Sequence, residues 1–77
     1  MVNTLAKWDL TRKSVENEVA YLARNCPHVN LGTFESRINA FLGQPNPASE
    51  QEHLAREQEK QQLLSDLRQW VIRSELL

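Results

Sequence analysis

The residues with the greatest potential for chemistry are Cys26 and the two histidines, His28 and His53. Cys26 and His28 form one close pair, separated only by Pro27, whereas His53 is distant in the sequence. Structural zinc sites use four ligands, usually in closely spaced pairs. A catalytic Cys–His pair needs an activated thiolate and a third group that orients the base. The sequence has neither pattern, so we expect residues 26–32 to be a connector, with no metal site and no cofactor.

Glycine-dependent catalytic motifs are also missing from the sequence. A nucleophile elbow and a phosphate-binding loop both require several glycines at fixed spacing. The chain has only Gly32 and Gly43, and its serines stand in no such context. The sequence therefore predicts no catalytic residues, and we expect the protein not to be an enzyme.

The length and the charge balance restrict the classes of partner. Seventy-seven residues are enough for one domain, residues 1–77, with a modest core. Cores of this size are commonly completed by a metal, a disulfide or a second chain. Nine Lys and Arg residues oppose ten Asp and Glu residues, and no block of five like charges occurs. Because non-specific DNA or RNA binding rests on a basic footprint, this balance disfavours nucleic acid as a partner.

The cellular location is predicted from the cysteine count and from hydropathy. A single cysteine excludes an internal disulfide and fits a reducing compartment. The sequence has no run of about 18 apolar residues, the length of a membrane span, and no secretory signal. We therefore expect a cytoplasmic protein that does not contact a membrane.

The elements that would position these residues are three helices, at about 4–25, 33–42 and 49–76, so the predicted fold class is all-α. In the first helix, apolar residues recur at steps of three and four, which is typical of one buried stripe. Arg12 takes one position of that stripe, which favours a kink near Asp9. The stripe comprises Leu5, Trp8, Val15, Val19, Leu22 and Cys26, while Leu10 and Tyr21 lie on the far face.

The second helix is short and has a turn after it. Thr33 occupies the expected N-cap position, and Gly43 stands where a left-handed C-cap residue belongs. Pro45 and Pro47 cannot continue a helix, so residues 44–48 are predicted to form a turn. The apolar residues of this helix are Phe34, Ile38, Phe41 and Leu42.

The third helix is the most distinctive element. Ser49 and Glu52 have the spacing of a capping box, and no Gly or Pro follows them. A helix of roughly 28 residues is about 42 Å long, whereas a compact domain of this length is about 30 Å across. We therefore expect the helix to overhang the fold, with its polar residues 50–62 either solvated or used for recognition. We also expect the first and third helices to pair antiparallel, with the second closing one end.

Apolar residues occupy two faces of the third helix. A wide face includes Leu63, Leu67 and Trp70, while Leu54 and Ile72 lie near the opposite side. One face can join the core, and the other is predicted to bind another protein or a second copy of this chain. Tryptophan is enriched among interface anchors, which favours Trp70. The residues predicted to contact the partner are Leu63, Leu67, Trp70, Val71, Ile72, Leu76 and Leu77.

These observations predict a non-catalytic protein–protein interaction module, such as an adaptor, an inhibitor or a regulatory subunit, that docks through its C-terminal amphipathic helix. The alternative is a dimeric regulator that binds nucleic acid. A helix-turn-helix joins its helices by a turn of three or four residues. The turn before the third helix is longer and contains two prolines, so the sequence favours the interaction module.

Overall fold

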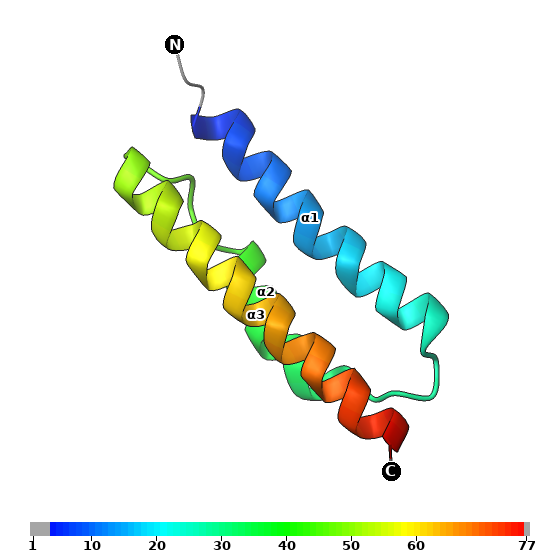
Figure 1. The fold of residues 1–77 in the computed structure, drawn as a ribbon. Coiled ribbons are helices and arrows are strands. Elements are labelled where there is room, and N and C mark those ends of the chain that lie inside the picture. Colours follow the sequence, from blue (N-terminus) through cyan, green and yellow to red (C-terminus); the bar gives the residue numbers. More distant parts are fainter. Residues whose placement is uncertain (1–3, 77) are drawn as a thin grey trace.

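The computed structural model describes the backbone of residues 4–76 and the side chains of residues 7–75. This part of the chain forms three α-helices: α1 (Thr4–Asn25), α2 (Glu35–Leu42) and α3 (Glu50–Leu76). A short 3-10 helix, η1 (Gly32–Phe34), comes directly before α2 (Figure 1). The predicted all-α fold with a long C-terminal helix is confirmed, and the helix ends agree with the prediction to within two residues.

The two long helices, α1 and α3, lie side by side and run in the same direction (Figure 1). Lys7 Nζ lies 3.3 Å from Glu50 Oε1 near the start of both helices. Further along both helices, Arg68 Nε donates a hydrogen bond to Glu18 Oε1 at 3.0 Å. The predicted antiparallel pairing is therefore wrong. The physical reason is that α2 and its two connectors carry the chain back along α1, so that α3 begins at the end where α1 begins.

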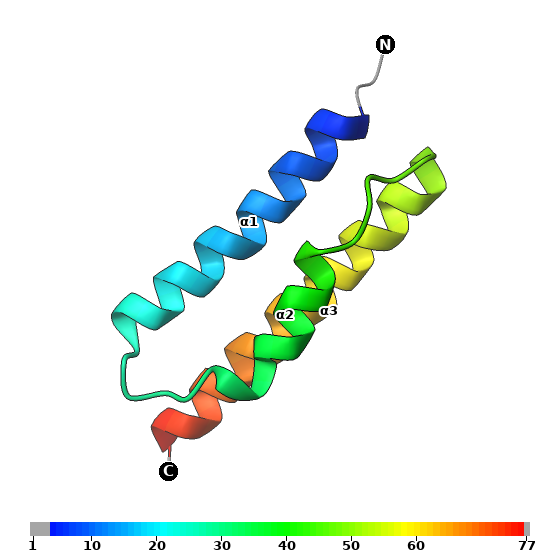
Figure 2. The ribbon, with the colours of Figure 1, turned by 180° about the vertical axis from the view of Figure 1, so that it is seen from behind.

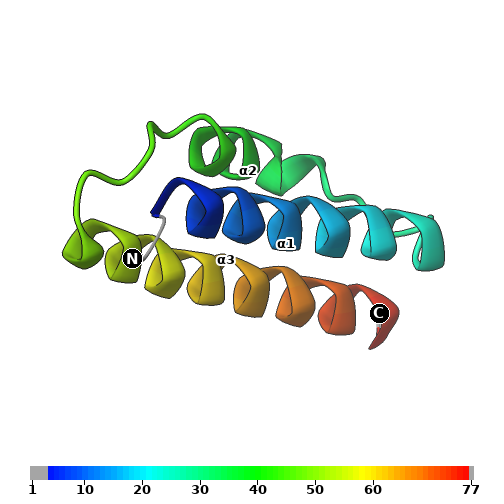
Figure 3. The ribbon, with the colours of Figure 1, turned by 90° about the horizontal axis from the view of Figure 1, so that it is seen from above.

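The short helix α2 lies along the side of the α1–α3 pair, as Figures 2 and 3 show. The ring of Phe41 packs on Trp8 of α1, with the ring centroids 5.4 Å apart. Directly before α2, the ring of Phe34 in η1 meets Trp70 of α3 edge-on, with a centroid distance of 6.0 Å. These two contacts hold the C-terminal end of α2 against α1 and the turn before α2 against α3. The prediction that this helix closes one end of the fold is wrong, because α2 covers a flank of the pair.

The molecule is elongated, with principal dimensions of 47 × 18 × 18 Å. The predicted overhang of α3 is wrong, because α1 lies beside α3 from the Lys7–Glu50 contact onward. Residues 50–62 are consequently not a projecting solvated arm. His53 is buried, and Glu57 is half-buried. The polar half of α3 therefore packs on the first half of α1.

The core lies between the three helices. Helix α1 is continuous from Thr4 to Asn25 and has no break near Asp9, contrary to the prediction. The reason is that Thr11 points inward more deeply than Arg12: Thr11 is 3% exposed, and its hydroxyl donates a hydrogen bond to the Glu57 carboxylate of α3. The buried apolar residues are Trp8, Val15, Leu22, Val29, Ile38, Phe41, Leu63, Leu64, Leu67 and Val71. The side chain of Leu5 lies outside the described residues.

The start of α3 is capped almost as the sequence predicts. Ser49 Oγ accepts a hydrogen bond from the backbone N–H of Glu52 at 3.2 Å. In return, Glu52 Oε2 accepts from the N–H of Ala48 at 2.8 Å, one residue before the position that a capping box uses. Both side chains thus satisfy backbone donors at the turn into α3, which fixes where the long helix begins.

The ends of α2 differ from the prediction. Thr33 lies inside η1 and does not cap α2. Instead, Asn30 Oδ1 accepts a hydrogen bond from the N–H of Gly32 at 2.9 Å, at the start of η1. Gly43 has a φ of −85°, so it is not left-handed. A Cβ at Gly43 would lie 3.1 Å from the backbone oxygen of Asn39, so close approach is the reason for this glycine.

Candidate interaction surface

Four large apolar side chains are exposed in the described part of the chain, and all of them belong to α1 or α3. Their exposed fractions are 67% for Leu10, 61% for Tyr21, 58% for Leu54 and 56% for Ile72. Single exposed apolar residues are common on proteins and need no explanation. A group of them on one face is informative, so their relative directions decide whether they form a surface.

On α1, Leu10 and Tyr21 point in nearly the same direction. They are eleven residues apart, which at 100° per residue leaves a difference of only about 20°. Both line shallow pockets in the groove between α1 and α3, of about 290 Å³ beside Leu10 and about 510 Å³ beside Tyr21. Lys60 and Leu64 of α3 help to form this groove. The side chain of Lys60 is half-buried, and that of Leu64 is buried. Leu10 and Tyr21 therefore flank the α1–α3 groove.

On α3, Leu54 and Ile72 also share one direction, because they are separated by five full turns of about 3.6 residues. Their direction lies about 160° from the mean direction of Leu63 and Leu67, two buried residues of α3. Arg68, which lines the groove with α1, is only about 40° from Ile72 around the helix. Leu54 and Ile72 are therefore turned outward and toward α1.

The four exposed side chains thus share one surface, on the side of the helix pair away from α2. In Figure 1 this pair is seen with α2 behind α3. We call this surface the α1–α3 face. It comprises Leu10, Ser14, Asn17 and Tyr21 of α1, and Leu54, Gln61, Arg68 and Ile72 of α3, all of them exposed.

The charges in the groove of the α1–α3 face neutralise one another. Arg68 pairs with Glu18 at 3.0 Å, and Lys60 Nζ lies 2.9 Å from Glu57 Oε2. Partial burial alone would raise the pKa of Glu57, but the hydrogen bonds from Thr11 and Lys60 outweigh it and lower that pKa. The carboxylate therefore stays ionised at neutral pH. A partner would meet a surface that has apolar corners and no excess of either charge.

The structure divides the residues that the sequence predicted as partner-binding. Leu63, Leu67 and Val71 are buried in the core of the chain, so a partner cannot reach them in this fold. Trp70 is half-buried, and its Nε1 donates a hydrogen bond to the backbone oxygen of Asn30 at 2.8 Å. Ile72 is exposed on the α1–α3 face. The side chain of Leu76 and the whole of Leu77 lie outside the described residues.

Of the four exposed apolar residues of the α1–α3 face, only Ile72 was among the predicted partner-binding residues. Leu54 of α3 was not among them, and neither were Leu10 and Tyr21 of α1. The sequence did contain their signal, because both stand on the far side of the apolar stripe of α1. Whether Leu10 and Tyr21 belong to a larger apolar surface depends on α3, whose exposed residues Leu54 and Ile72 lie on the same side. That coincidence follows from the parallel pairing of the helices, which the sequence did not predict.

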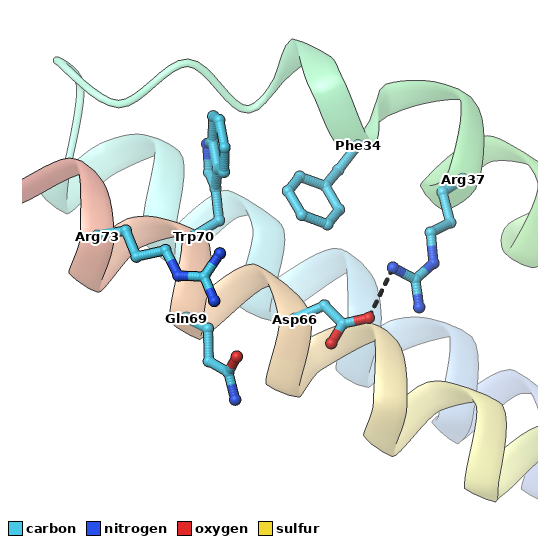
Figure 4. Close-up of a pocket in the computed structure, with 6 residues that line it drawn as sticks. All are labelled: Phe34, Arg37, Asp66, Gln69, Trp70 and Arg73. Carbon is cyan, nitrogen blue, oxygen red and sulfur yellow. Dashed lines mark ion pairs between the residues drawn. The ribbon is translucent and has the colours of Figure 1, made fainter.

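A second hollow lies between α2 and α3, around the exposed edge of Trp70 (Figure 4). Its volume is about 270 Å³. Arg37 Nη1 lies 2.8 Å from Asp66 Oδ2 across it, and the hydrogen bond from Arg37 lowers the pKa of Asp66. This pair and the Phe34–Trp70 contact tie α2 to α3, which assigns the hollow to the joint between these helices. Its lining residues are Phe34, Arg37, Asp66, Gln69, Trp70 and Arg73.

The Cys and His side chains are placed at different parts of the molecule. The thiol of Cys26 donates a hydrogen bond to Glu75 Oε1 at 3.4 Å, and partial burial together with this carboxylate raises the pKa of Cys26. His28 is exposed, and His53 is buried beside Lys7 at the other end of α1. Among residues 7–75, no three Cys, His, Asp or Glu side chains lie close enough together to hold a metal ion.

The fold and this surface define a small all-α protein whose two long helices form a face with an exposed apolar residue at each of its four corners. No protein-family model matches the chain, and neither a curated protein nor a solved structure matches it. None of the helices within residues 4–76 has both the length and the apolarity that crossing a membrane requires.

Proposed function

We propose that this chain is a non-catalytic protein–protein interaction module, of the adaptor, inhibitor or regulatory-subunit type, that acts in the cytoplasm. The observation that carries the proposal is the α1–α3 face, on which Leu10, Tyr21, Leu54 and Ile72 are all more than half exposed. Helix α3 contributes to docking through Leu54 and Ile72, and α1 completes the surface. The free thiol of Cys26 supports a reducing compartment.

The size of the core supports the same proposal. The core in the described part of the chain has ten buried apolar residues, which is a small number. Leaving four large apolar residues in water on one face forfeits burial that would be worth about 1.5–3 kcal/mol for each fully covered side chain. A partner that covers the α1–α3 face would recover that free energy, and this supports docking as the role of the face.

The experiment is affinity capture from cells that naturally contain the protein, with variants of the face as controls. We expect wild type to retain a defined protein and Ile72→Asp and Leu54→Asp to lose it. Ala55→Asp is the matched control, because Ala55 is exposed next to Leu54 but points about 100° away around α3. Circular dichroism of each variant verifies that the helices are intact. Equal retention by all variants would reject the α1–α3 face as the docking surface.

The salt dependence of binding distinguishes this proposal from the alternative, a dimeric regulator that binds nucleic acid. Five of the nine Lys and Arg side chains are paired with carboxylates, which weakens any basic footprint. Binding to nucleic acid falls steeply between about 50 and 200 mM salt, whereas apolar docking does not. Retention of nucleic acid that is lost over this range, with no protein retained, would favour the regulator.

A further inference from the structure

We propose that the α1–α3 face binds a second copy of this chain, in an antiparallel dimer with two-fold symmetry. This inference rests on the proposed function and names the partner. A two-fold interface uses the same patch on both copies, so each residue must find its complement on that patch. The observation that carries the inference is that the four apolar corners of the face are placed symmetrically along the helices.

The symmetry follows from the register of the helices. Leu10 and Tyr21 have their midpoint between Val15 and Glu16 of α1, and Leu54 and Ile72 have theirs at Leu63 of α3. Contacting residues of the two helices differ by 46 positions at Thr11–Glu57 and by 50 at Glu18–Arg68. Leu63 and Val15 differ by 63 − 15 = 48 positions, between those values. Both midpoints therefore lie at the same height.

We place a two-fold axis at that height, in the plane of the α1–α3 face and perpendicular to the helices. This axis puts α1 of the second copy over α1 of the first and α3 over α3, and each of these helix pairs is antiparallel. Leu10 of each copy then meets Tyr21 of the other, and Leu54 meets Ile72. All four exposed apolar side chains of each copy are covered in one step. Ser14 and Asn17 fall near the axis, where small polar residues fix the register of a helical interface.

The helix dipoles favour the antiparallel arrangement over a parallel one. Within each chain, α1 and α3 run in the same direction, so their positive N-terminal ends lie together. An antiparallel copy brings the negative C-terminal ends of its own two long helices beside them. The paired charges Glu18–Arg68 and Glu57–Lys60 leave no net charge in the groove to oppose association.

The dimensions of the molecule allow an interface of the size that a stable dimer needs. Principal dimensions of 47 × 18 Å limit the footprint of the face to at most ~850 Å² for each copy, and a standard protein interface uses ~800 Å² per partner. The whole length of the face is therefore needed. The position of the apolar residues at the corners of the face fits this requirement, because a second copy shifted along the helices would leave some of them exposed.

The mass in solution is the first measurement. Sedimentation equilibrium of the full chain at micromolar concentration should give about twice the monomer mass of 8.9 kDa. Because each substitution acts twice in a two-fold dimer, Tyr21→Asp should weaken association by at least about 100-fold. Ala20→Asp is the matched control on α1: Ala20 is exposed but directed about 100° away from Tyr21, and its dimer should persist.

The orientation of the two copies in the dimer is tested by disulfide crosslinking between separately prepared cysteine variants in a Cys26→Ser background. Mixing Leu10→Cys with Tyr21→Cys under mild oxidation should yield the mixed disulfide, and so should Leu54→Cys with Ile72→Cys. Mixing Leu10→Cys with Leu54→Cys should not. A mixed product only from this last combination would replace the antiparallel dimer with a parallel one. A strictly monomeric wild type would overturn the dimer, and a partner captured through Ile72 would then leave the proposed function standing.

Discussion

At the scale of single residues, the two tryptophans have different roles. Trp8 is 0% exposed, between Phe41 of α2 and the guanidinium of Arg56, which lies 5.0 Å from the ring centroid. Trp70 is half-buried and uses its indole N–H to hold the connector at Asn30. The sequence placed both on apolar stripes and favoured Trp70 as the interface anchor. It did not give the depth of burial of either ring, because periodicity indicates a direction and not a depth.

Trp8→Ala should lower the free energy of unfolding by about 3–5 kcal/mol, because it removes the largest buried side chain of the core. Trp8→Phe should cost much less, since the indole N–H is buried without a hydrogen-bond partner among the described residues. Urea unfolding followed by circular dichroism measures both values. An equal loss in the two variants would contradict the packing described for Trp8.

The pair Arg37–Asp66 gives stability that depends on pH. The hydrogen bond from Arg37 lowers the pKa of Asp66 in the folded chain below its ordinary value of 3.8. Protonation therefore occurs more readily in the unfolded chain. The stabilisation is complete above the unfolded-state pKa and is lost as the pH falls through the lowered folded-state pKa.

We accordingly expect a carboxyl titration of Asp66, followed by NMR, to have its midpoint below the ordinary value. Arg37→Gln should move that midpoint upward, because it removes the positive charge and the hydrogen bond that is the main cause of the shift. Asp66→Asn should reduce the loss of stability in acid. An unchanged Asp66 midpoint in Arg37→Gln would show that the ion pair does not form in solution.

At the scale of the elements, the sequence predicted where helices begin and end but not how they pair. Local signals set the ends: Ser49 and Glu52 at the start of α3, and the two prolines before it. The direction of pairing depends on how far the connectors carry the chain. The stretches between Asn25 and Gly32 and between Leu42 and Glu50 are long enough to return beside α1, and nothing in the helical periodicity reports that distance.

The same limit applies to the candidate site. Periodicity showed that α3 has two apolar faces, and only packing shows which is inside. Leu63 and Leu67 share the inward direction with Val71, while Ile72 and Leu54 remain outside. Four of the seven predicted partner-binding residues could therefore be assigned between core and surface only from the three-dimensional arrangement.

The cap at the start of α3 can be tested by itself. Ser49→Ala removes the hydroxyl that accepts from the N–H of Glu52, and should lower the free energy of unfolding by about 1 kcal/mol. Ser49→Asp should retain most of the stability, because aspartate accepts the same hydrogen bond and its charge suits a helix N-terminus. Denaturant unfolding of the three proteins measures this. No difference between Ser49→Ala and wild type would mean that another group caps the helix.

At the scale of the whole molecule, the chain is a pair of parallel long helices, and the short helix α2 lies along one flank of this pair. The exposed apolar residues gather on the flank that α2 does not cover. The antiparallel arrangement predicted from the sequence would have placed Leu10 and Leu54 at opposite ends.

The parallel direction is tested by zero-length carbodiimide crosslinking, which joins a lysine to a nearby carboxylate. We expect a Lys7–Glu50 link within the monomer, since these side chains are 3.3 Å apart. The Lys60–Glu57 pair, at 2.9 Å within α3, serves as an internal control for reactivity. Peptide mass spectrometry identifies the links. A link from Lys7 to Glu75 in place of Glu50 would show antiparallel helices.

The parallel pairing also has a consequence for how the chain is made. The polar residues of α1 that contact α3 find their partners 43 to 50 positions later in the sequence, at Glu50, Glu57 and Arg68. At synthesis rates of about 5–20 residues per second, α1 is made several seconds before the matching part of α3. During that interval the core residues Trp8 and Val15 lack the part of their packing that α3 supplies. A chain that stops after α2 would leave both side chains uncovered on that side, so it should aggregate.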